Sequence, residues 1–109
     1  MKIAHHPFGT IDWKKINKEK GKGVSGKAWS QTFMMGVIRI RKVEYSAGYV
    51  ADHWCEKGHI IYCISGRMTS ELKDGRKLKI KKGMSYHVGD NCDAHRSTTK
   101  KGCKLFIVD

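Results

Sequence analysis

The sequence predicts one all-β domain, built as a sandwich, a barrel or a jelly roll from many short strands. Three observations predict this class. From Lys27 onward, runs rich in Val, Ile, Tyr, Phe and Thr alternate with Gly, Asp, Asn and Lys at intervals of about ten residues. The single proline, Pro7, lies outside these runs, so no central strand lacks a backbone donor. No long helical period interrupts them.

The expected strands follow one another closely along the chain, separated by glycine and polar turn residues. They cover residues 28–34, 36–45, 49–55, 59–65, 67–73, 77–81, 84–88, 94–99 and 103–108. Between two of them, Asp74-Gly75 predicts a hairpin with a type I′ turn, which needs positive φ at both central residues. We therefore expect residues 1–109 to form a single domain, with the basic segment 1–27 packed on or flanking it.

Composition restricts the class of protein further. A hydrophobic fraction of 39% excludes a disordered chain. The N-terminus lacks the apolar run of a signal peptide, and no stretch approaches the roughly 18 apolar residues of a membrane span. These features predict a cytoplasmic protein without a membrane partner. Its cysteines are then expected as reduced thiols, used for metal binding or simple burial rather than disulfides; they are Cys55, Cys63, Cys92 and Cys103.

The formal net charge of +12 would attract anions of any kind. Much of the excess lies in the lysine-rich residues 13–27, which we interpret as a solvated, glycine-punctuated loop rather than a dedicated anion site. The lysines are not interleaved with aromatic residues, and no nucleic-acid-binding motif is present. Nucleic-acid binding is therefore a remote alternative to binding a small anionic molecule.

A group of metal-binding residue types lies near the middle of the chain. In an extended strand, His53 and Cys55 share one face, and His59 follows on the next strand after a three-residue turn. If both faces point inward, these side chains meet at the end of a hairpin. Imidazole and thiolate suit transition metals and are poor ligands for magnesium or calcium. The alternative is a set of hydrogen-bonded histidines beside a non-coordinating cysteine.

Two longer segments resemble the cupin family. Residues 48–66, GYVADHWCEKGHIIYCISG, resemble its first motif, with His53 and His59 on or within one residue of ligand positions. Residues 83–99, GMSYHVGDNCDAHRSTT, resemble the second motif, in which His95 takes the place of the further histidine. The strings DHWC, KGHI, GMSY and KLFIVD are similar to those of a small group known as DHCW-motif cupins. The resemblance implies a single-domain cupin-like antiparallel β-barrel, a jelly roll.

The resemblance also implies a metal site and a class of function. Cys55 stands where the general motif has its second His, and His59 stands where it has Glu, which implies a site of three histidines and one thiolate: His53, Cys55, His59 and His95. The cofactor would be one divalent transition metal, namely zinc, iron or nickel. The function would be binding or transforming a small anionic molecule, either as a metal-dependent oxygenase or isomerase-type enzyme or as a non-catalytic binding or sensing module.

Other roles stay open at this point. The resemblance is compatible with a homodimer, and catalytic residues are unassigned because no carboxylate stands among the clustered residues. Arg39 and Arg41 alternate with isoleucines, and a phase shift after them predicts a bulge at Arg41-Lys42. One of these arginines would bind a substrate carboxylate or phosphate if it faces the cavity. Alternation with Tyr86 predicts that His87 points away from the metal site.

Overall fold

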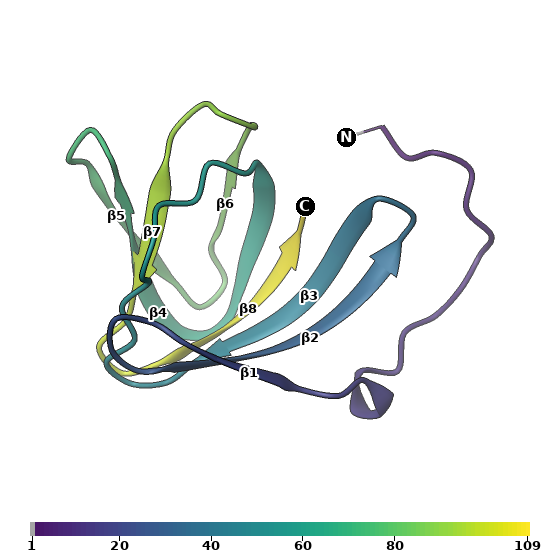
Figure 1. Ribbon diagram of the computed structural model, residues 1–109, viewed down its shortest axis with the longest axis horizontal. Helices are drawn as coiled ribbons and strands as arrows, with labels where there is room; N and C mark the ends of the chain where they lie inside the picture. The colour runs from purple at the N-terminus through teal and green to yellow at the C-terminus, as the bar shows by residue number, and fades with distance from the viewer. Residues whose placement is uncertain (1) are drawn as a thin grey trace.

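The computed structural model describes residues 2–109, which form two antiparallel β-sheets sharing one long strand (Figure 1). The strands are β1 (Glu19–Lys22), β2 (Lys27–Met35), β3 (Ile38–Tyr45), β4 (His59–Leu72), β5 (Lys77–Lys81), β6 (Ser85–Val88), β7 (His95–Thr98) and β8 (Cys103–Val108). A 3-10 turn, η1 (Trp13–Lys15), precedes them. Because every named strand pairing is antiparallel, the predicted fold class is confirmed.

Strand β4 belongs to both sheets. Its first half pairs with β6 and β8 in the first sheet, whose strands lie in the order β1-β2-β3-β8-β4-β6. Its second half pairs with β5 and β7 in the second sheet. Figure 1 shows β4 curving at the bottom of the view, with β5 and β7 on one side and β8, β3 and β2 on the other. The two sheets thus face each other across an interior.

The bend in β4 replaces a predicted break. The sequence predicted two strands, 59–65 and 67–73, separated by Gly66, and the structure joins them into one. The pairing of β4 with β8 shifts register between Cys63 and Ser65, and Gly66 has φ of +75°. A glycine with positive φ at a bulge can turn a strand without ending its hydrogen-bond ladder. The predicted break at Gly66 is therefore a bend within one strand.

Segment 49–55 is not the strand that alternation predicted. Only Val50 and Cys55 make isolated bridges there, while Asp52 and His53 are exposed. The alternation of residue types predicted a strand, but a ladder needs a continuous partner strand, and the chain bends at Asp52 and His53. His53 and Cys55 therefore do not share the inward face that regular pleating predicted.

The lysine-rich segment also differs from its prediction as a loop. Glu19–Lys22 form β1, which pairs with β2 in full register, and all four of its residues are exposed. Backbone pairing with a neighbouring strand overrides a composition that favours a solvated loop. The side chains still face solvent, as the interpretation of this segment required.

The hairpin at Asp74-Gly75 is confirmed, but its turn type is not. The Gly75 amide donates to Leu72 O at 2.9 Å, and the Leu72 amide donates to Arg76 O at 2.8 Å. Gly75 has φ of +99°, whereas Asp74 is not among the residues with positive φ. This is a three-residue connection in which glycine follows a type I turn, so only one position needs the left-handed region.

The core lies between the sheets and is built from inward-facing residues of β3, β4, β5 and β8. Its buried members are Val43, Ile61, Cys63, Met68, Ile80, Cys103, Leu105 and Ile107. Cys63 and Cys103 are therefore buried apolar residues, whereas Cys92 is exposed on a loop. Within residues 2–109, no helix has the length and apolar character needed to cross a membrane.

The same truncation should lower the free energy of unfolding by different amounts on the two faces of β4. Ile61 is 3% exposed in the core, and its neighbour Ile60 is 48% exposed on the outer face. We expect Ile61→Ala to lower the free energy of unfolding by about 2–4 kcal/mol, because a buried cavity replaces the side chain. Ile60→Ala, the matched control, should cost less than about 1 kcal/mol. Urea unfolding measures both, and equal costs would contradict this assignment of faces.

Candidate metal centre

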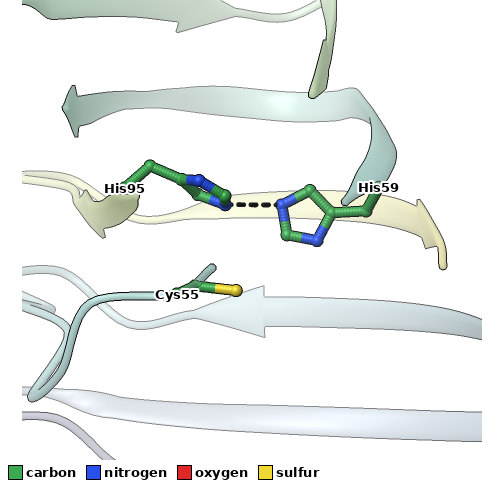
Figure 2. Close-up of side chains that lie close together, drawn as sticks. All are labelled: Cys55, His59 and His95. Carbon is green, nitrogen blue, oxygen red and sulfur yellow. Dashed lines mark hydrogen bonds between the residues drawn. The ribbon is translucent and has the colours of Figure 1, made fainter. Parts of the chain in front are cut away.

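Three side chains with metal-binding atoms converge inside the fold: Cys55, His59 and His95. One potential ligand atom from each lies within 4.8 Å of the others. Figure 2 shows the two imidazole rings meeting edge to edge, with the cysteine sulfur beside them. This Cys/His/His group could hold a metal ion.

Local backbone contacts place each member of the group. Cys55 and His95 face each other across an isolated bridge, in which the Cys55 amide donates to His95 O at 2.7 Å and the His95 amide donates to Cys55 O at 3.0 Å. His59 opens β4 directly after Gly58, whose amide donates to Asp90 Oδ1 at 2.7 Å. A Cβ on Gly58 would lie 2.6 Å from the Asp90 nitrogen, so only glycine permits this close approach.

The imidazole rings of His59 and His95 are oriented by oxygen acceptors behind them. His95 Nδ1 lies 2.7 Å from the carbonyl oxygen of Asp93, which can only accept, so this nitrogen carries a proton. His59 Nδ1 faces Asp109 Oδ2 at 3.4 Å. The Nε2 atoms of the two rings meet at 2.8 Å, a hydrogen-bond distance at which the donor depends on the tautomers of the rings.

Burial favours the neutral form of His59. Desolvation lowers its pKa and the nearby His95 lowers it further, while Asp109 acts in the opposite direction and is outweighed. The His59 side chain is only 7% exposed. A neutral imidazole with a free Nε2 lone pair is the form that binds metal ions.

The carboxylate behind His59 is held by two arginines. Arg39 binds Asp109 through two contacts, Nε to Oδ1 at 2.9 Å and Nη2 to Oδ2 at 3.1 Å, and Arg41 Nη2 lies 3.2 Å from Oδ2. The Asp109 side chain is fully buried. Burial alone would raise the pKa of this carboxyl, but the Arg39 hydrogen bonds and the charges of both arginines outweigh it and lower the pKa.

The arginines therefore face inward, which was the condition for substrate binding by one of them, but both bind a carboxylate of the protein itself. The predicted bulge at Arg41-Lys42 is wrong, because β3 pairs with β2 and β8 without a register shift there. Regular alternation puts Arg39, Arg41 and Val43 on one face of β3. The apolar residues Ile38 and Ile40 occupy the other face. In this strand the inner face therefore carries the two charged residues, the reverse of the usual apolar-inside pattern.

His53 lies outside the group. Its side chain is 79% exposed, and its Nδ1 contacts Asp52 Oδ1 at 2.6 Å on the surface. Asp52 is likewise exposed. The structure brings together three of the four predicted ligand residues and leaves the fourth in solvent.

Two residues beside the group were not predicted from the sequence. Asp109 contacts His59 from 50 positions away in the chain, and no local pattern signals such a contact. The Tyr86 hydroxyl lies 3.4 Å from His59 Nε2, and burial raises the pKa of this phenol. The sequence did contain a signal for Tyr86, because the alternation that predicts an outward His87 also predicts an inward Tyr86. His87 is indeed exposed.

Comparison with known proteins gives the fold a name. Models of known protein families give no match to the chain, and a search of curated proteins gives none either. Solved structures do match. Ectoine synthase from P. lautus has a TM-score of 0.76 at 18% identity, with 93% of this chain and 76% of that chain covered. The polyketide cyclase RemF from Streptomyces resistomycificus also has a TM-score of 0.76, at 19% identity, with 94% and 78% covered.

A third similar structure belongs to the cupin superfamily. It is a sugar phosphate isomerase from Silicibacter pomeroyi, with a TM-score of 0.70 at 10% identity and 92% of this chain and 74% of that chain covered. The chain therefore has a cupin fold. At these identities the likeness concerns the fold alone, and chemistry has to be argued from the side chains.

The Asp109 contacts predict a large effect of a nearly isosteric change. We expect Asp109→Asn to lower the free energy of unfolding by about 2–3 kcal/mol, because two inward arginines lose a buried charged partner. The control is Asp74→Asn, since Asp74 binds Arg76 at the surface and its loss should change stability little. Thermal and urea unfolding compare the two variants. Equal effects would show that the buried carboxylate has no special role.

Proposed function

We propose that this protein is a metal-dependent cupin that holds one divalent transition-metal ion through Cys55, His59 and His95. The ion would bind or transform a small anionic organic molecule. His53, the fourth ligand predicted from the sequence, is left out of this proposal because its side chain faces solvent.

One observation carries the proposal: the 2.8 Å approach of His59 Nε2 to His95 Nε2. Their Nδ1 atoms face a carboxylate and a carbonyl oxygen, and their Nε2 atoms point toward each other. At this distance the two nitrogens either share a proton or bind one metal cation between them. A metal ion satisfies both nitrogens at once, and the oxygen acceptors behind the rings are the usual partners of metal-binding histidines.

The donor set fits a borderline ion. Zinc–nitrogen bonds of about 2.0–2.1 Å at tetrahedral angles place two imidazole nitrogens roughly 3.3 Å apart. Because the two nitrogens lie 2.8 Å apart, they would have to move apart by about 0.5 Å on metal binding. Two imidazoles and one thiolate suit zinc, iron or nickel, and the Cys55 sulfur would bind as the thiolate.

Three protein donors leave room for an exogenous ligand, as in catalytic metal sites. An open position supports the enzyme hypothesis, and the three named structural neighbours are a synthase, a cyclase and an isomerase. One observation favours the alternative of a binding or sensing module. The Tyr86 hydroxyl lies 3.4 Å from His59 Nε2, where its oxygen could complete and close the coordination.

Metal content tests the proposal directly. We expect about one zinc, iron or nickel ion per chain in protein purified without chelator, measured by elemental analysis. His95→Ala and Cys55→Ser should lose most of this metal, because each removes one of three donors.

His53→Ala is the matched control for the metal measurement, since it removes a histidine of the same segment that lies outside the group. It should keep its metal. Absence of metal from the wild type, even after zinc, iron or nickel is added, would refute the proposed centre. Loss of metal in His53→Ala would instead restore the four-ligand site predicted from the sequence.

Cobalt substitution distinguishes an open centre from a closed one. We expect the cobalt protein to show a sulfur-to-metal charge-transfer band that disappears in Cys55→Ser, because the thiolate is a ligand. Added azide should shift the visible bands, since three protein donors leave a coordination position free. A spectrum that does not respond to azide in the wild type but does so in Tyr86→Phe would favour the closed sensing module.

A further inference from the structure

A cavity of about 380 Å³ reaches the metal-binding group at one of its three members, His95. His95 and Tyr86 line it, and the remaining wall comes mainly from β4, β5 and β6. Its volume is within the range of small-molecule sites in proteins, toward the lower end. The cavity is therefore large enough for a compact organic molecule whose one end reaches the group.

The middle of this cavity is apolar. Five aliphatic or thioether side chains line it: Leu72, Leu78, Ile80, Met84 and Val88. Leu78 is 46% exposed and Met84 is 40% exposed, so part of this apolar surface faces the opening. A ligand with a hydrocarbon body would remove this surface from water, which favours binding in proportion to the area covered.

One polar side chain in the wall is incompletely satisfied inside the protein. Ser70 is 2% exposed, and its hydroxyl makes no hydrogen bond of normal geometry among residues 2–109, although the Tyr86 hydroxyl lies near enough to interact with it. A buried hydroxyl without a well-formed hydrogen bond is costly. It points into the cavity from the inward face of β4, next to the phenol that reaches the metal-binding group. This hydroxyl is available to donate to a ligand.

Charges occur only toward the opening of the cavity. Arg76 is already paired with Asp74 and Asp93, at 2.7 and 3.1 Å, while Lys79 makes no ion pair among the described residues. The inner end, in contrast, offers two hydroxyl donors, Ser70 and Tyr86, beside the proposed cation. The cavity thus has hydrogen-bond donors and a proposed cation at one end and hydrocarbon along its walls. This arrangement fits a molecule with an oxyanion head and an apolar body.

We propose that the cavity binds a small monocarboxylic acid with an apolar body, its carboxylate directed inward to Ser70, Tyr86 and the metal-binding group. The inference rests on the proposed function and narrows its ligand class. The hydrocarbon lies against Leu78 and Ile80, and the opening leaves the far end of the molecule near Lys79.

Calorimetric titration of the full chain with butanoate, hexanoate, octanoate and 1-hexanol tests this inference. Each sample is assayed for zinc, and each titration is repeated after removal of the metal with chelator. We expect affinity to rise about threefold for each added methylene. Hexanoate should bind at least about tenfold more tightly than 1-hexanol, because only the acid supplies an oxyanion.

Ser70→Ala and Thr69→Ala form a matched pair of variants. Ser70→Ala should weaken hexanoate binding about tenfold and leave zinc content unchanged, since the hydroxyl binds the carboxylate and not the metal. Thr69 is the adjacent residue on the opposite face of β4, and Thr69→Ala should bind hexanoate like the wild type. A Ser70→Ala variant that binds hexanoate as tightly as the wild type would overturn the inward placement of the carboxylate.

The remaining outcomes separate this inference from the proposed metal function. Protein that contains zinc but binds none of the acids at millimolar concentration overturns the inference and leaves the metal centre standing. Protein that holds no zinc, iron or nickel even after these ions are added, but binds hexanoate through Ser70, supports the cavity assignment and refutes the metal centre. Equal affinity for hexanoate and 1-hexanol overturns the ligand class, because the site would then recognise hydrocarbon alone.

Discussion

The fully buried carboxylate of Asp109 constrains much of the interior. It follows the end of β8, binds the two inward arginines of β3, and lies behind the ring of His59 at the start of β4. A charge without solvent is tolerated only when it is paired and hydrogen-bonded. Because Arg39 and Arg41 satisfy that requirement, the same carboxylate can remain ionised and orient an imidazole. Charge pairing and the geometry of the candidate metal centre thus depend on one side chain.

The second determinant of the site is the curvature of β4. A straight strand of this length would separate its ends by roughly 40 Å. His95 pairs with Leu72 at the end of β4, yet its ring contacts His59 at the beginning of the same strand. The bulge near Ser65 and the left-handed glycine at position 66 allow the strand to turn and close this distance. Residues far apart along one strand therefore form a single site.

The interior combines this site with an apolar cavity. The metal-binding group occupies one end, and the inward residues of β5 and β6 provide hydrocarbon walls next to it. A buried serine without a well-formed internal hydrogen bond is an unusual feature of such a wall, and an incoming ligand would satisfy it. The cavity and the group together define one functional interior, consistent with chemistry located in a site carried by a widely used fold.

The all-β class, most strand positions and Cys55 and His59 as candidate ligands follow from alternation, turn chemistry and residue type in the sequence alone. His95 was a candidate only through the resemblance to the second cupin motif. The sequence could not decide that His53 faces solvent, since the segment before β4 bends at residues 52 and 53 instead of continuing as a strand. Nor could it find Asp109, whose role depends on which distant faces converge, and alternation turned Tyr86 inward without showing that it meets His59. A local period tells which side chains share a face; only tertiary structure tells what that face meets.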